Sequence, residues 1–161
     1  MSAAAVEITL VTLEGVRLDE VVDEYTTLLS SADANDEALD RLAPNPYPDD
    51  EHASRDFAEA TRDDLLERRL ADADVVRRAL APFRSFRASM TDDDMLRAHT
   101  LEVPRGEVDA WLRTLNAIRL VLATRLGIIE DDDHDPEDPR FGIYDWIGYR
   151  LELLIDAEMG D

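Results

Sequence analysis

The sequence predicts an all-α protein, a single-domain bundle of about five helices over residues 1–161 with a short two-stranded β-ribbon at one edge. Three observations predict this architecture. Apolar residues recur at steps of three and four residues in several long segments, as in amphipathic helices. Two short stretches instead look extended, and one of them is rich in β-branched residues. The chain is also long enough to bury one core without disulfides or metal ions.

The segment from Val103 to Gly127 is the helix around which the other elements are expected to pack. Pro104 lies where the first residue of a helix is tolerated, and Gly127 lies where a helix commonly ends. Three polar residues, Asn116, Arg119 and Arg125, interrupt its apolar run. The stripe that must be buried consists of Val108, Trp111, Leu112, Leu115, Ile118, Leu122 and Leu126.

The N-terminal part is expected to hold one strand and one long helix. Residues 6–13 alternate loosely and favour a strand, and residues 99–103 look extended and are its expected partner. A helical period then runs from Val16 to Ala32. Asp19 and Glu20 fall in its expected first turn, where the helix dipole favours acidic side chains.

The middle of the chain is divided by prolines. A short helix is expected from Asp36 to Leu42, and the three prolines that follow within residues 44–54 exclude a helix and predict a surface crossing. Helical spacing resumes over residues 54–80, with a break at Thr61 as the expected N-cap. Pro82 is expected to end or kink this element. Its inward face is predicted to be Leu66, Leu70, Ala73, Val76 and Leu80.

The C-terminal part is expected to be an acidic loop followed by a helix. Residues 129–141 form the loop, and the last helix should run from Gly142 to Glu158, antiparallel to the central helix. Trp146 and Tyr149 lie off its predicted inward face and are either contacts to other helices or anchors of an interface. That inward face consists of Ile143, Tyr144, Ile147, Leu151, Leu154 and Ile155.

Composition limits the possible functions. The chain has 38 acidic residues against 17 basic ones, all arginine, and a formal net charge of −21. Such a charge repels DNA at long range, so it is interpreted first as a solubilising surface and second as a surface for a basic partner. No cysteine is present, which excludes thiolate metal sites and thiol redox chemistry. Without a signal peptide or a membrane-spanning run, the protein is expected to be cytoplasmic, with no membrane partner.

Enzyme signatures are missing. The sequence has no Gly-rich phosphate loop, no HExxH and no GxSxG, and its three histidines have no spaced partners. The acidic loop fails as a calcium site of the EF-hand type, because counting from Asp131 puts Pro136 at the required glycine and Gly142 at the required glutamate. We therefore expect no catalytic residue, metal or cofactor. A metal-dependent enzyme on a carboxylate-rich site is kept as an alternative.

One stretch, residues 75–91, is locally basic. Arginines interleaved with aromatic residues can grip nucleic acid, so a regulator that binds DNA directly is a further alternative. The favoured interpretation is that the phenylalanines anchor the core while the arginines pair with surplus carboxylates. The residues concerned are Arg77, Arg78, Phe83, Arg84, Phe86 and Arg87.

The two C-terminal helices carry a recognisable pattern. WLRTLNAIRLVLATRLGI at residues 111–128 is followed by an acidic linker and by DPRFGIYDWIGYRLELLI at residues 138–155. YPDD at residues 47–50 and TRDDL at residues 61–65 extend the similarity toward the N-terminus. The chain thereby resembles a family of small bacterial proteins that is often encoded beside the Clp protease adaptor and carries the name oxidative stress regulator AosR.

The resemblance implies a cytoplasmic transcriptional regulator of the oxidative-stress response that works through a protein partner in the transcription machinery. Redox sensing in that family is attributed to a cysteine pair, which this chain lacks, so thiol sensing is not carried over. Direct DNA binding is not expected. A homodimer through an uncovered apolar face is compatible with the sequence.

The polar residues of the pattern are interpreted as structural. Asn116 and Arg119 lie one helical turn apart, and Asp145, at the start of the last helix, is placed to reach Arg119. A buried polar network of this kind would hold the two helices in register. The alternative is a binding site in which Arg119 and Arg125 hold a small anion or a carboxylate of the partner. Trp146 is included among the candidate binding residues.

Overall fold

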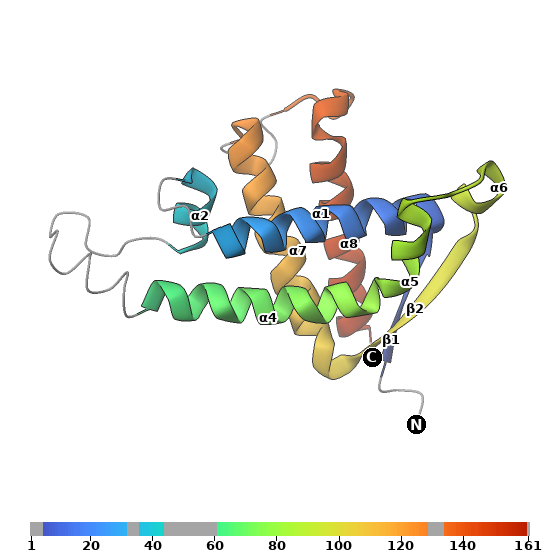
Figure 1. Ribbon diagram of the computed structural model, residues 1–161, viewed down its shortest axis with the longest axis horizontal. Coiled ribbons are helices and arrows are strands. Elements are labelled where there is room, and N and C mark those ends of the chain that lie inside the picture. Colours follow the sequence, from blue (N-terminus) through green and yellow to red (C-terminus); the bar gives the residue numbers. More distant parts are fainter. Residues whose placement is uncertain (1–4, 32–35, 44–60, 129–133, 161) are drawn as a thin grey trace, which may run out of the picture.

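Helices dominate the computed structural model of the chain, which describes residues 5–31, 36–43, 61–128 and 134–160 (Figure 1). Two strands and seven α-helices occur in these ranges, together with short 3₁₀ turns at Ser85–Arg87 and Pro139–Phe141. In chain order they are β1 (Ala5–Val11), α1 (Thr12–Ser31), α2 (Glu37–Leu42), α4 (Asp63–Ala79), α5 (Ala81–Arg84), α6 (Asp92–Met95), β2 (Ala98–Pro104), α7 (Arg105–Leu126) and α8 (Gly142–Met159).

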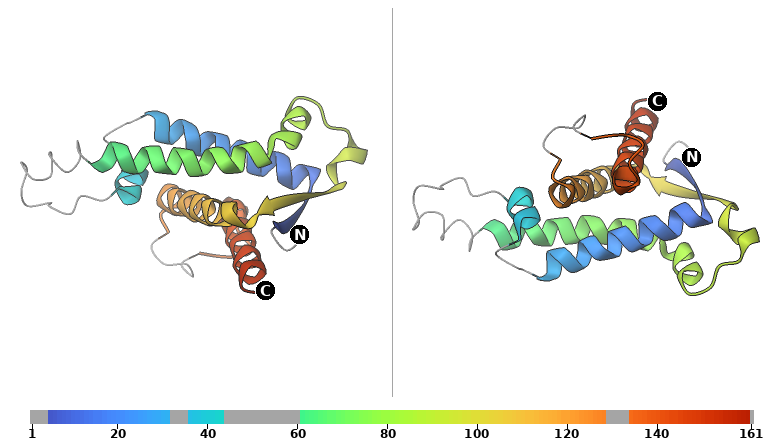
Figure 2. Two further views of the ribbon diagram at one scale, coloured as in Figure 1. Left: turned by 90° about the horizontal axis from the view of Figure 1, so that it is seen from below. Right: turned by 90° about the horizontal axis from the view of Figure 1, so that it is seen from above.

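The predicted fold class is confirmed: a mostly helical body carries a two-stranded antiparallel sheet. The five longer helices, α1, α2, α4, α7 and α8, match the predicted bundle, and α5 and α6 add one turn each. Helices α1 and α4 lie side by side as one layer, α7 packs across this layer, and α8 lies beyond α7 (Figure 2). Helices α7 and α8 are antiparallel neighbours, as predicted (Figure 1).

The sheet forms as predicted, but the first helix begins earlier. Ile8 pairs with Leu101 in the antiparallel register, and β1 alternates between buried and exposed residues. Helix α1 begins at Thr12, four residues before the predicted start at Val16, because Thr12 N–H ends the ladder by donating to the Arg97 carbonyl. Asp19 therefore lies inside the helix instead of in its first turn, and it is buried.

Residues typical of helix ends lie at the observed ends of several helices. Thr91 caps α6 in a reciprocal capping box with Asp94, and Gly127 ends α7 in the left-handed conformation, with φ of 73°. Pro82 lies in α5, directly after the end of α4, as expected. The predicted N-cap at Thr61 is wrong, because Arg62 occupies the N-cap position of α4 and makes no side-chain cap hydrogen bond.

The predicted apolar faces supply most of the core. Trp111, Leu115 and Ile118 of α7 are buried with Ile147 and Leu151 of α8. One residue of the predicted α8 face is wrong: the Ile155 side chain is 43% exposed. The predicted surface crossing at residues 44–54 and the start of the acidic loop, residues 129–133, lie outside the described residues. No helix among those described is long and apolar enough to cross a bilayer.

Candidate functional site

Arg119 binds the two C-terminal helices together. It projects from α7, and its guanidinium carbon lies 4.2 Å from the centre of the Tyr144 ring on α8. A Cβ at Gly148 would lie 3.0 Å from Arg119 Nε, so the absence of a side chain there leaves room for the guanidinium. Asn116, one turn earlier on α7, is exposed. This close packing supports the structural interpretation of Arg119.

Asp145 has a different partner from the one predicted. Its Oδ1 lies 2.7 Å from His134 Nε2, across a separation of eleven residues, so it fastens the end of the acidic loop to α8 instead of pairing with Arg119. The His134 side chain is 6% exposed and lies against the rings of Phe141 and Tyr144. No local spacing in the sequence distinguishes this pairing from one with Arg119.

Arg125 also has a partner outside the two C-terminal helices, the Asp36 carboxylate. Its Nη1 and Nη2 donate to the two carboxylate oxygens of Asp36 at 3.0 and 2.8 Å, and Asp36 Oδ1 in turn accepts from Ala38 N–H as the N-cap of α2. The hydrogen bonds from Arg125 lower the pKa of Asp36 below its ordinary value. This bidentate pair attaches α2 to the end of α7.

The Asp36 pair gives a testable pH dependence. Because the folded-state pKa is lowered, the pair stabilises the protein above the ordinary aspartate pKa and is lost as pH falls through the folded-state value, below about pH 4. Asp36→Ala should cost about 1 kcal/mol at pH 7 through loss of the cap, and this cost should shrink at acidic pH. The exposed Asp40→Ala in the same helix is the control, and urea unfolding at several pH values is the measurement. A cost independent of pH would contradict the assignment.

A small pocket of about 230 Å³ does lie beside Arg119. It is lined by Asn116 and Arg119 of α7, Tyr144 of α8 and Arg41 of α2. Arg41 Nη1 also donates to Thr124 Oγ1 at 3.0 Å. The structure thus places Arg41 at this pocket, whereas the predicted ligand pair was Arg119 with Arg125.

A substitution can distinguish a structural role of Arg119 from a role in binding a partner. Arg119→Met keeps the apolar stem and removes the charge over Tyr144, which should lower the free energy of unfolding by about 1 kcal/mol. We expect the affinity for a protein partner to stay unchanged. Arg78→Met, at an exposed position of α4, is the control for stability. Lost partner binding with unchanged stability would instead identify Arg119 as a binding residue.

Trp146 belongs to a network that the sequence did not reveal. Its Nε1–H and Arg150 Nη2 both donate to Glu14 Oε2 at 3.0 Å, while Val11 N–H donates to Glu14 Oε1 at 3.0 Å. Arg150 Nη1 also donates to the Thr9 carbonyl at 3.1 Å. The network joins α8 to β1 and α1. Glu14 and Arg150 are 136 residues apart, so no local spacing could have paired them.

The contacts of Glu14 lower the pKa of its carboxyl group. Burial by itself would raise the pKa of this carboxyl, but the hydrogen bonds from Val11, Arg150 and Trp146 together lower it. The ionised form is therefore the one that the network holds. Trp146 is a structural contact of β1 and α1 through this carboxylate.

The basic segment does not leave its arginines unpaired. Arg84 and Arg87 bind the buried Asp19 at 3.1 and 3.2 Å, and Arg77 binds Asp23 at 3.2 Å. Arg78 lies 3.5 Å from Asp74. Phe83 is buried and Phe86 packs against the core. The predicted pairing of these arginines with carboxylates and the predicted core contacts of the two phenylalanines are therefore observed.

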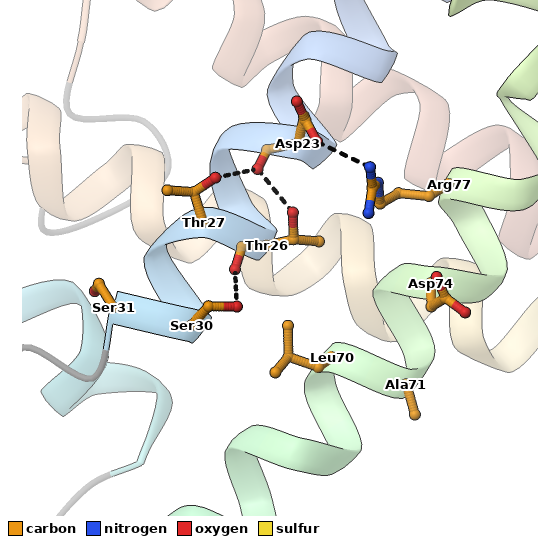
Figure 3. A pocket seen from close by; sticks show the side chains of 9 residues that line it. All are labelled: Asp23, Thr26, Thr27, Ser30, Ser31, Leu70, Ala71, Asp74 and Arg77. Carbon is orange, nitrogen blue, oxygen red and sulfur yellow. Dashed lines mark hydrogen bonds and ion pairs between the residues drawn. The ribbon is translucent and has the colours of Figure 1, made fainter.

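A polar groove of about 740 Å³ lies between α1 and α4 (Figure 3). Its hydroxyl groups are satisfied by their own helix: Thr26 and Thr27 donate to the Asp23 carbonyl, and Ser30 donates to the Thr26 carbonyl. Arg77 pairs with Asp23 across it. These hydroxyl groups therefore have partners without a ligand. Within the described ranges no three His, Asp or Glu side chains are grouped to hold a metal ion.

A largely apolar hollow lies between β1 and α8. It has a volume of about 290 Å³. Its floor includes core residues of β1 and α7, such as Ile8 and Trp111, and its wall is the C-terminal half of α8. We call this the β1–α8 groove; its lining is Val6, Glu7, Ile8, Thr9, Leu10, Leu18, Trp111, Leu115, Arg150, Leu153, Leu154 and Ala157.

Together the fold and these contacts define a helical protein whose motif residues mainly connect helices and whose apolar groove opens beside a short sheet. The chain belongs to the family described as domain of unknown function DUF2017, whose family model matches residues 2–158. Comparison with curated proteins and with solved structures found no match.

Proposed function

We propose that this protein is a non-enzymatic cytoplasmic regulator that acts by binding another protein. The observation that carries the proposal is the apolar surface at the β1–α8 groove. The Leu153 side chain in its wall is 40% exposed, and Tyr149, on the preceding turn of α8, is 55% exposed. Exposed apolar and aromatic side chains that gather beside a groove are typical of protein–protein interfaces.

The contacts of the motif residues support a binding role over catalysis. Arg125 is held by Asp36, Asp145 by His134 and Trp146 by Glu14. Each contact joins two elements of the fold. Side chains that hydrogen-bond to one another can hold helices in alignment, but they are poorly placed for proton transfer with a substrate.

The resemblance to AosR supports a proposal for the partner and for the cellular response in which the protein acts. We propose a partner within the transcription machinery and a role in the oxidative-stress response, exercised without thiol sensing because the chain has no cysteine. Direct contact with DNA is disfavoured by the net charge of −21 and by the pairing of Arg77, Arg84 and Arg87 with carboxylates.

Affinity purification from cells that encode the protein tests the proposal. The full chain is used as bait, the captured proteins are identified by mass spectrometry, and binding of the purified candidate is titrated against salt. A component of the transcription machinery that binds at a one-to-one ratio is the expected result. Stoichiometric binding of a metal ion with turnover of a substrate, or binding to DNA alone, would contradict it.

A further inference from the structure

Among the described residues, no strand pairs with the second edge of β1. The sheet has only two strands within the described residues, and β2 occupies one side of β1. In an antiparallel pair, peptide groups point alternately toward the partner strand and away from it. Thr12 N–H donates to Arg97 on the β2 side, whereas Val11 N–H and the Thr9 carbonyl are bound by Glu14 and Arg150 of other elements. The odd-numbered residues of β1 therefore direct their peptide groups outward.

The outer edge is closed at one end and open at the other. Glu14 and Arg150 occupy the outward groups of Val11 and Thr9, next to α1. The outward groups of Ala5 and Glu7 follow along the same edge, beside the groove. An extended backbone that entered the groove from this end would meet peptide groups of a strand that have no hydrogen-bond partner among the described residues, which is the geometry of strand addition.

The surroundings of the groove select the side chains of such a segment. Leu153, Leu154 and Ala157 provide an apolar wall, and Glu7 lines the groove as an acid. Arg150 already forms an ion pair with Glu14, whose Oε2 lies 3.0 Å from Arg150 Nη2. The net charge of −21 adds long-range attraction for a cation and opposes a second copy of this chain.

From these observations we infer that the β1–α8 groove binds an extended segment of a partner protein, with alternating apolar and basic residues, as a third strand along Ala5–Glu7. The inference rests on the proposed function, since it names the surface and the chemistry of the partner. The apolar residues of the segment fill the groove against Leu153 and Ala157, and its basic residues meet Glu7 and the acidic surface.

Peptide binding tests the inference directly. The probe is a short synthetic peptide of alternating valine and arginine, measured by fluorescence anisotropy with the full chain. Two matched probes carry glutamate in place of arginine, or methyl groups on alternate backbone nitrogens. We expect saturable one-to-one binding of the arginine peptide, and binding about tenfold weaker or more for either matched probe. No binding, or equal binding of all three, overturns the inference.

Variants locate the site. Leu153→Asp, and the exposed Ala157→Glu as a second variant, should each weaken the arginine peptide about tenfold, while Leu96→Asp should not. Leu96 is 76% exposed and does not line the groove. Unfolding curves establish that the variants are folded. Equal loss in the Leu96 variant, or a wild-type dimer in sedimentation that Leu153→Asp converts to monomers, overturns the assignment to a partner segment.

The outcomes for groove and function are distinguishable. If affinity purification with Leu153→Asp and Ala157→Glu yields the same partner as the wild type, the groove assignment fails and the proposed function stands. If the wild type binds no component of the transcription machinery, the proposed function fails whatever the peptide does.

Discussion

Replacing Gly15 by alanine should destabilise the protein by about 3 kcal/mol, near the upper end of the usual cost of overpacking a core. A Cβ at Gly15 of α1 would overlap three atoms of the Phe83 ring. The Phe83 side chain is 1% exposed and lies edge-on to His99, so the ring has little room to move. Urea unfolding of the purified variant measures the loss.

Two variants control this prediction. At Gly106 of α7 an added Cβ meets nothing within 4 Å, so Gly106→Ala should leave stability unchanged or raise it by up to about 1 kcal/mol. Phe83→Leu removes much of the ring that Gly15→Ala would strike. The double variant should therefore be less destabilised than the sum of the two single variants. Strict additivity would show that the two residues are not in contact.

Removing both arginines that bind Asp19 should also cost about 3 kcal/mol, the expected penalty for a buried charge that loses its partners. The Asp19 side chain is 1% exposed and accepts hydrogen bonds from Arg84 and Arg87. The double variant Arg84→Ala, Arg87→Ala leaves this carboxylate inside the protein without a cation. Its free energy of unfolding at pH 7 is the quantity to compare with the wild type.

The matched control changes two arginines of the same stretch. Arg77 and Arg78 pair with Asp23 and Asp74, whose side chains are 41% and 61% exposed. Because exposed ion pairs contribute little, Arg77→Ala with Arg78→Ala should cost less than about 1 kcal/mol. Equal costs for the two double variants would contradict the assignment of residues 84 and 87 as partners of a buried acid.

Much of the fold was predictable because its signals are local. The apolar period predicts α7 and α8, Gly127 and Thr91 mark helix ends, and β-branched residues predict β1. The start of α1 was misplaced because strand and helix follow each other without a loop. Without that boundary Asp19 resembles a first-turn acid, although it is a buried ion-pair partner.

The site was less predictable because its contacts are not local. Asp145 pairs with His134, Arg125 pairs with Asp36, and Trp146 donates a hydrogen bond to Glu14. None of these pairs follows from helical spacing. In a chain with 38 acidic residues, every arginine has many candidate partners in the sequence. Only the packing of α1, α2, α7 and α8 decides among them.

In the proposed arrangement, the motif residues of α7 and α8 align helices and the partner binds at the β1–α8 groove. The most direct measurement is the affinity of the purified partner for Arg119→Met and for Leu153→Asp, with the stability of each variant measured in parallel. We expect Arg119→Met to retain the partner at reduced stability and Leu153→Asp to lose the partner while it stays folded. Loss of the partner on changing Arg119, with full binding by the Leu153 variant, would contradict it.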